Sequence, residues 1–373
     1  MDLLFLFSKE LREFRNELLK IKERQNNVVT LEKWEQDIIE SIRRQTEKHN
    51  LNNVTRTKAY LSFYLRYPEI HWSFLAHMVS RNGGWNMTDL KGDLLPNLLT
   101  NQDRKNLFSF IERGNWLIFQ DAFPQLLLYE YSLIKEQNLF YLLPYLHVSI
   151  FMEAAWNDFW KKKNHKLLAI ATIINEQNYI EKRLIQNKIF QKNVLNTFEF
   201  KLYDFLPFNH ILFPYSNEGE RPKLVGATVH HFASLHERIL FGKLLYSLLF
   251  LKKGIHDKVL SWAKEHPHTG SRSDYWNDLF SPIKISVNQS RYEIRTRECQ
   301  LKKGALPLYS PYLEKAWSHV IQEKALIHDW FQDLSVLKYL KDSRIPSGDI
   351  YDDYCLTIEA IELAVAAKSL ILG

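Results

Sequence analysis

Hydrophobic residues recur every three or four positions along most of the chain, with charged residues between them. This period is typical of amphipathic helices, which bury one face. Thr100, followed by Asp103, has the form of a capping box, and Thr30 stands where it can cap the second helix. The pattern predicts helices over residues 3–21, 31–50, 55–67, 68–80, 100–114, 116–135, 145–163, 166–187, 228–251, 311–339 and 351–372.

Two long segments, residues 198–226 and 266–311, interrupt this period. The first is broken by prolines and glycine, and the second contains the strand candidate, residues 283–294. We therefore predict a mainly α fold, a multi-helix globular bundle with two long irregular segments and little or no sheet. The first segment separates an N-terminal helical region, 1–197, from a C-terminal helical region with long loops, 198–373, and the two regions can also form one continuous domain. Aromatic residues in both segments suggest that they cover the helices and wall a cleft.

Composition supports a globular chain and narrows its class. The 373 residues are 46% hydrophobic, with only 12 Gly and 12 Pro, which disfavours a fold of many short strands. The net charge of +6 comes from 49 basic and 43 acidic residues spread along the sequence, so nucleic acid is not indicated as a partner.

Cysteine content and the apolar runs bear on the compartment. Cys299 and Cys355 are too few for a disulfide framework and lack the spacing of a zinc finger, which fits a reducing compartment. The apolar start, residues 1–7, lacks a basic region before it and a cleavage site after it. The apolar run 239–251 is interrupted by Gly242 and Lys243 and is too short to span a membrane. We expect a cytoplasmic protein with no transmembrane segment.

The most informative stretch runs from residue 56 to residue 92. The helix predicted over 69–80 is apolar on every side and should be buried, yet Ser73, His77 and Arg81 form a polar stripe along it. We expect Gly83 and Gly84 to end the helix in a turn. A buried guanidinium needs a carboxylate or an anion, so the stripe either forms an internal network or binds a ligand. The candidate ligand-binding residues here are Arg81, Asn82, Trp85 and Asn86.

A second cluster lies at the start of the helix predicted over 228–251. His230, His231, Glu237 and Arg238 form a polar wedge that suits a polar substrate or acid–base chemistry. The wedge contains no pair of ligands at the spacing of a helical zinc motif, so we predict no metal and no cofactor. The alternative is that these side chains are solvated or satisfied within the core.

Two further sites come from single segments. The loop 266–276 is rich in donors, and we take Arg272 within it as a candidate ligand-binding residue, although the same loop can be an ordinary surface loop. In the helix 145–163, Glu153 stands among aromatic residues and is a candidate for a partly buried carboxylate. Catalytic residues stay unassigned. The candidates are His77, Glu153, His230 and Glu237.

Several motifs of the chain, some of them among the candidate residues above, also resemble those of a protein family. The chain resembles an uncharacterised bacterial protein family of spore-forming Gram-positive organisms, a domain of unknown function, over most of its length. The resemblance implies a bacterial cytoplasmic protein and assigns no activity, substrate or catalytic residue. It rests on Arg56, Thr57, Pro68, Glu69, Ile70, His71, Trp72, residues 80–85, His230, His231 and residues 269–276.

Three functional hypotheses follow. The first is a protein that holds a small anionic ligand or a protein partner in a cleft formed by Arg81, Asn82, Trp85, His230, Glu237 and Arg272. The second is a hydrolase-type enzyme in which His230 or His77 acts as the base and Glu153 or Glu237 orients it. The third is peripheral association with a membrane or nucleic acid, which requires the positive charge to gather on one face.

Overall fold

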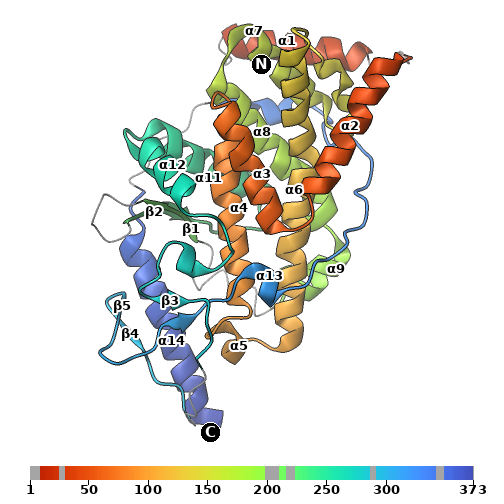
Figure 1. Cartoon of the computed structure of the whole chain (residues 1–373). Coiled ribbons are helices and arrows are strands. Elements are labelled where there is room, and N and C mark those ends of the chain that lie inside the picture. The colour runs from red at the N-terminus through yellow and green to blue at the C-terminus, as the bar shows by residue number, and fades with distance from the viewer. Residues whose placement is uncertain are drawn as a thin grey trace, which may run out of the picture.

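The chain folds into a mainly α structure in which long helices form one end and short strands with the last helix form the other (Figure 1). The computed structural model describes residues 9–24, 30–197, 210–215, 223–285, 291–341 and 348–372. Residues 3–8 of the predicted first helix lie outside the described residues, as do parts of the segment 198–226 and of the predicted strand 283–294. The helices are α1 Lys9–Arg24, α2 Lys33–His49, α3 Asn53–Arg66, α4 His71–Asp89, α5 Leu95–Leu98, α6 Asn101–Ile134, α7 Ile150–Lys162, α8 His165–Ile180, α9 Lys188–Phe190, α11 Leu235–Tyr246, α12 Ile255–Glu265, α13 Leu313–Ala316 and α14 Tyr351–Leu372.

The described chain also contains shorter π-helical and 3₁₀ turns. Glu181–Ile185, Gln191–Leu195 and Ser247–Leu251 are π-helical, while Phe140–Leu146, Arg272–Asp274 and Leu334–Leu340 are 3₁₀. The helices α4 and α6 run through the middle of the molecule (Figure 1), where α4 packs on α3, α6, α8 and α11. Buried hydrophobic residues from both halves of the chain form one cluster. The division at residue 197 stays a prediction.

Helix ends follow local capping chemistry, with two corrections to the sequence reading. Thr100 and Asp103 form the predicted capping box at the start of α6. The cap of α2 is Glu32, not Thr30, because Glu32 forms a capping box with Glu35. The prediction that a helix ends at Gly114 is wrong, since α6 continues through it to Ile134. A Cβ at Gly114 would lie 3.1 Å from Leu184, so the glycine marks a close contact.

The predicted Gly-Gly turn is also absent, because α4 continues through Gly83 and Gly84 to Asp89. Both glycines serve packing. A Cβ at Gly84 would lie 2.5 Å from atoms of Asn53 and His268, and one at Gly83 would lie 2.9 Å from the Asn115 amide. The missing side chains let α3, α6 and the segment around His268 approach α4 closely.

Small sheets occupy the segments predicted to be irregular. Strands β1 His210–Tyr215 and β2 Lys223–Thr228 pair antiparallel, with Leu212 opposite Gly226. Two more two-stranded sheets pair β3 Phe280–Ser281 with β6 Leu308–Tyr309, and β4 Thr296–Arg297 with β5 Gln300–Leu301. The described ends of the predicted strand 283–294 are not strand. The paired strands lie on either side of this range, since β3 ends at Ser281 and β4 begins at Thr296.

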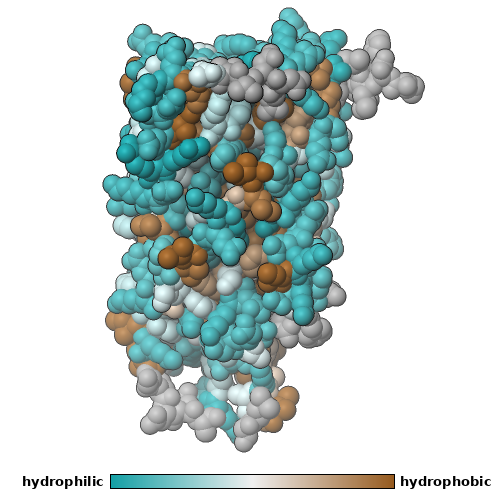
Figure 2. Space-filling model, turned by 90° about the vertical axis from the view of Figure 1, so that its right-hand side faces the viewer, coloured by the Kyte–Doolittle hydropathy of each residue, from teal (hydrophilic) through white to brown (hydrophobic). Residues whose placement is uncertain are grey.

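The prediction of one helix over residues 311–339 is wrong, since only α13 and the turn Leu334–Leu340 are helical there. The intervening chain has no regular secondary structure, and side chains of the helical body bind its carbonyl groups. Arg183 donates to the carbonyls of Leu326 and His328 at 3.0 and 2.8 Å, and Arg113 donates to the carbonyl of Glu323 at 2.7 Å. Figure 2 shows hydrophobic side chains on one face as separate patches among hydrophilic ones.

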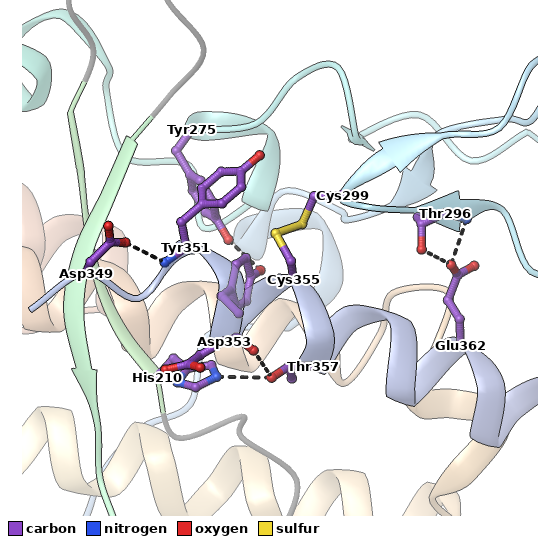
Figure 3. Close-up of a disulfide and its surroundings, with 11 residues drawn as sticks. His210, Tyr275, Thr296, Cys299, Asp349, Tyr351, Asp353, Cys355, Thr357 and Glu362 are labelled. Atoms are coloured by element: carbon purple, nitrogen blue, oxygen red, sulfur yellow. Dashed lines mark hydrogen bonds between the residues drawn. A yellow bond between two sulfur atoms is a disulfide. The ribbon is translucent and has the colours of Figure 1, made fainter.

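The two cysteines are paired, which corrects the expectation that they stay reduced. The disulfide Cys299–Cys355 joins the β4–β5 turn to α14, with the two Cα atoms 5.3 Å apart (Figure 3). Beside it, the buried Glu362 carboxylate of α14 accepts hydrogen bonds from the backbone N–H groups of Arg295 and Thr296 at 3.0 and 2.9 Å. The C-terminal helix is therefore attached by one covalent and several polar contacts.

Candidate functional site

Arg81 is fully buried and holds the loop that follows α12. Its Nη1 donates to the carbonyl of His266 at 2.7 Å, and its guanidinium lies 4.4 Å from the centre of the Trp262 ring. The carboxylate of Asp274 lies 3.8 Å from Nη2. Burial lowers the pKa of Arg81 to about 10, against the opposing charge of Asp274. The predicted polar stripe is thus part of an internal network.

Asp274 is the acceptor at the centre of this network. Trp85 Nε1 donates to it at 3.2 Å, the Thr269 backbone N–H at 3.0 Å and the Thr269 hydroxyl at 2.5 Å. Burial opposes ionisation, but the contact with His268 and the charge of Arg81 hold the pKa of Asp274 below its usual value. Trp85 therefore has a structural partner for its polar atom.

Asn82 and Asn86 also have protein partners. The Asn82 amide donates to the Leu212 carbonyl and its oxygen accepts from the Leu212 N–H, at 2.9 and 2.8 Å, so it pairs with β1 like a strand residue. Asn86 accepts from Arg272 at 3.1 Å. Arg272 also binds Asp89 at 2.7 Å and the hydroxyls of two tyrosines, which uses its five N–H groups within the protein.

The catalytic candidates lie on separate elements. His77 is buried on α4, where its Nδ1 is 2.9 Å from the Thr57 carbonyl and burial holds its pKa well below the usual value. Glu153 is buried on α7 and forms an ion pair with Arg24, although burial still raises its pKa. Within the described chain, no hydrogen bond joins His77 or His230 to Glu153 or Glu237.

The wedge predicted at the start of the helix 228–251 is not on one helix. His230 and His231 are exposed and precede α11, which begins at Leu235 because the Ser234 side chain caps it. His231 has a left-handed backbone, with φ of 55°. Glu237 and Arg238 are on α11, and Arg238 donates to Gln177 and to the Phe232 carbonyl at 3.0 and 2.8 Å.

A cavity of about 260 Å³ lies between α4, α6, α8 and α11. Arg56 and Tyr60 of α3, part of β1 and the segment around Phe232 complete its wall. Most of the lining is hydrophobic, with five aromatic side chains. The polar lining residues are Arg56, Ser80, Asn86, Asn115, Glu176, Gln177 and Arg238. A second cavity, beside Arg272 and His210, measures only about 40 Å³ and has room for roughly one water molecule.

Glu176 is the one carboxylate among the lining residues of this central cavity. Trp72 Nε1 donates to one oxygen and Gln177 Nε2 to the other, each at 3.1 Å. Burial raises the pKa of Glu176 to about 8, which these two hydrogen bonds oppose and the charge of Asp121 reinforces. A carboxyl group with a raised pKa inside a hydrophobic cavity is typical of a functional site.

The sequence reading did not single out Glu176 or the cavity. One signal was present: Glu176 stands two positions after a nearly uninterrupted apolar run, residues 167–174, which marks a helix buried on all sides. A carboxylate at the end of such a run is expected to be partly buried. The cavity itself depends on how α3, α4, α6, α8 and α11 pack, which no local pattern encodes.

Comparison with known proteins gives one family and one relative. The family model described as "Protein of unknown function (DUF2515)" matches residues 48–344, which include every residue that lines the central cavity. The chain is 46% identical over 237 residues, 64% of its length, to "Uncharacterized protein YppC" of Bacillus subtilis (strain 168), covering 72% of that protein. No solved structure matches the chain. Because the match spans most of its residues, the chain belongs to the DUF2515 family of unknown function.

Proposed function

We propose that the protein binds a small, mainly hydrophobic molecule in the central cavity. The observation that carries this proposal is the cavity itself, about 260 Å³ with hydrophobic and aromatic walls and a few polar groups. A dry apolar cavity of about 150 Å³ is enough to bind benzene, so this one has room for a larger molecule.

The cleft proposed from the sequence is less well supported. An anionic ligand needs accessible donors, but Arg272 directs its N–H groups to protein acceptors. Arg81 keeps Nε and Nη2 without a hydrogen-bond partner among the described residues, but its side chain is fully buried against Trp262 and the loop. Both arginines that line the cavity are also ion-paired, Arg56 with Glu112 and Arg238 with Glu181. An anionic ligand at Arg81, His231 or Arg272, or a protein partner there, stays a prediction.

The two other hypotheses gain no specific support. A His/Glu acid–base pair requires a histidine within hydrogen-bond reach of its carboxylate, and the described candidates do not form such a pair. Association with nucleic acid or a membrane surface stays a prediction that depends on where the charge of +6 gathers. None of the described helices combines the length and the apolar character needed to span a bilayer.

Binding of an uncharged hydrophobic dye, N-phenyl-1-naphthylamine, tests the proposal. Val79 lines the cavity from α4, and Val79→Phe places a ring inside it. We expect fluorescence enhancement with the native protein and an affinity at least about tenfold lower for the variant, because the added ring occupies the space the dye needs. Leu240→Phe is the control, since Leu240 is 40% exposed on α11 and does not line the cavity.

The result that would contradict the proposal is equal dye affinity for the native protein and Val79→Phe, with both proteins unfolding cooperatively. Native mass spectrometry of the purified protein adds an independent measurement. A bound mass that is lost on denaturation in the native protein and is absent from Val79→Phe identifies the natural ligand of the same cavity.

We also propose the cytoplasm as the location, because two cysteines in 373 residues are few for a chain built for an oxidising compartment. The Cys299–Cys355 disulfide weighs against this, since the cytoplasm keeps most thiols reduced. Cell fractionation followed by alkylation of free thiols tests the location and the redox state of the cysteines. Protein in the soluble cytoplasmic fraction with both cysteines alkylated supports the proposal. Protein in an extracytoplasmic fraction with neither cysteine alkylated overturns it.

A further inference from the structure

The charges around the central cavity do not balance. Its two arginines each have a carboxylate partner outside the lining, Glu112 for Arg56 and Glu181 for Arg238. Glu176 has two neutral donors, Trp72 and Gln177, and no cation pairs with it among the described residues. An ionised Glu176 is therefore one negative charge without a counter-ion inside a hydrophobic space.

Glu176 is partly buried, and a charge without a partner in such a site is costly, so Glu176 favours a bound proton or a bound cation. Without a ligand the proton is favoured, since burial raises the pKa of Glu176 to about 8. A bound cation replaces that proton. It also finds the Trp72 and Tyr60 rings in the same wall, and aromatic faces attract cations.

We propose that the ligand of the central cavity is a hydrophobic amine, whose protonated nitrogen pairs with Glu176 while its apolar body fills the space between α4, α6 and α11. The proposal rests on the function proposed above and names the class of ligand. A carboxylate ligand is disfavoured because it would bring a negative charge into the cavity, where no cation of the described chain is free to pair with it. A neutral alcohol forms only a neutral hydrogen bond with the protonated Glu176, which is weaker than a charge-assisted one.

Three compounds of one shape test the proposal: 3-phenylpropylamine, 3-phenylpropanol and 3-phenylpropionate. Each is titrated by calorimetry into the native protein, into Glu176→Gln and into Glu265→Gln, which removes an exposed carboxylate on α12 as a charge control. We expect the native protein and Glu265→Gln to bind the amine at least about tenfold more tightly than the alcohol, because the hydrogen bond is charge-assisted. In Glu176→Gln the amine loses this preference while the alcohol still binds.

Proton exchange gives a second readout. Because Glu176 is mostly protonated at pH 7, binding of the amine releases close to one proton, and the measured enthalpy changes with the ionisation enthalpy of the buffer. Glu176→Gln removes this buffer dependence.

The outcomes separate the two proposals. If the alcohol binds as tightly as the amine, or if Glu176→Gln keeps the preference for the amine, the amine proposal is overturned while the cavity remains a binding site. If neither these compounds nor the uncharged dye bind the native protein, the function proposed for the cavity is overturned together with its ligand class.

Discussion

At the scale of single residues, His71 shows how burial controls a charge. Its ring is stacked between His165, with centroids 5.1 Å apart, and Phe250, with centroids 4.3 Å apart. Nδ1 lies 3.1 Å from the Tyr246 hydroxyl. Burial, reinforced by the neighbouring His165 and His256, lowers the pKa of His71 to about 4. The stack therefore holds a neutral imidazole, and a protonated one disrupts it.

The pH dependence of stability follows from this shift. His71 has a pKa near 6.5 in the unfolded chain and about 4 in the fold, so its stabilising effect is complete above pH 6.5 and is lost as the pH falls towards 4. The unfolding free energy of the native protein should fall between pH 7.5 and pH 5. We expect this fall to be about 1 kcal/mol smaller in His71→Phe, which keeps a stacked ring; this figure allows for the partial exposure of His71 to solvent.

Urea unfolding at the two pH values measures the effect. The exposed His319 provides the control, because His319→Phe removes a histidine without touching the stack. Other buried histidines, among them His77 and His268, also have lowered pKa values, so a residual pH dependence is expected in every variant. An unchanged dependence in His71→Phe would show that the stack tolerates the charged ring.

At the scale of elements, the two glycines of α4 differ in what surrounds them. A Cβ at Gly84 would lie 2.5 Å from Asn53 and His268, which are hydrogen-bonded to each other, and Asn53 also donates to the Ser80 carbonyl. A Cβ at Gly83 would meet the Asn115 amide at 2.9 Å, and Asn115 lines the cavity and has space to move. The neighbours of Gly84 are therefore held in place, while the Asn115 side chain beside Gly83 can move.

We therefore expect Gly84→Ala to lower the unfolding free energy by about 1–3 kcal/mol through overpacking. Gly83→Ala should stay within about 1 kcal/mol of the native protein, because the gain in helix propensity offsets the shift of Asn115. Chemical denaturation of the two variants side by side checks this difference. Equal destabilisation would mean that neither neighbour moves.

The same glycines show what the sequence could and could not predict. The period of hydrophobic residues predicts most helices correctly because an amphipathic face is a local property, and the Thr100 capping box is local as well. A glycine has two local meanings, a turn or a close approach, and only the tertiary neighbours of Gly83, Gly84 and Gly114 select the second. The helix predicted over 311–339 failed for a similar reason, since distant arginines bind its carbonyls.

The candidate site was less predictable than the fold. The polar residues of α4 stand out in the sequence because they interrupt a buried helix, but their role depends on partners nearly two hundred positions away, such as Asp274 for Trp85. The cavity has no sequence pattern, because it is the space that five packed helices leave unfilled. Glu176 was within reach of a local argument, as a carboxylate two positions after an apolar run.

At the scale of the whole molecule, the cavity and the C-terminal helix belong to different parts of the chain. All cavity residues lie between positions 56 and 245, within the region that matches the family model, whereas α14 lies beyond residue 344. The Cys299–Cys355 disulfide links the two parts and closes a loop with a sequence separation of 56 residues. This arrangement predicts that the disulfide stabilises the molecule without shaping the cavity.

Reduction of the disulfide tests this division. By loop entropy, a link of this length stabilises the fold by up to about 4 kcal/mol, so dithiothreitol should lower the Tm of the native protein while the affinity for the hydrophobic dye stays the same. The double variant Cys299→Ser, Cys355→Ser is the control, and its Tm should be low and independent of reductant. If reduction instead abolishes dye binding, α14 and the strands it touches, including β2, contribute to the wall of the cavity, and the two parts of the molecule act as one.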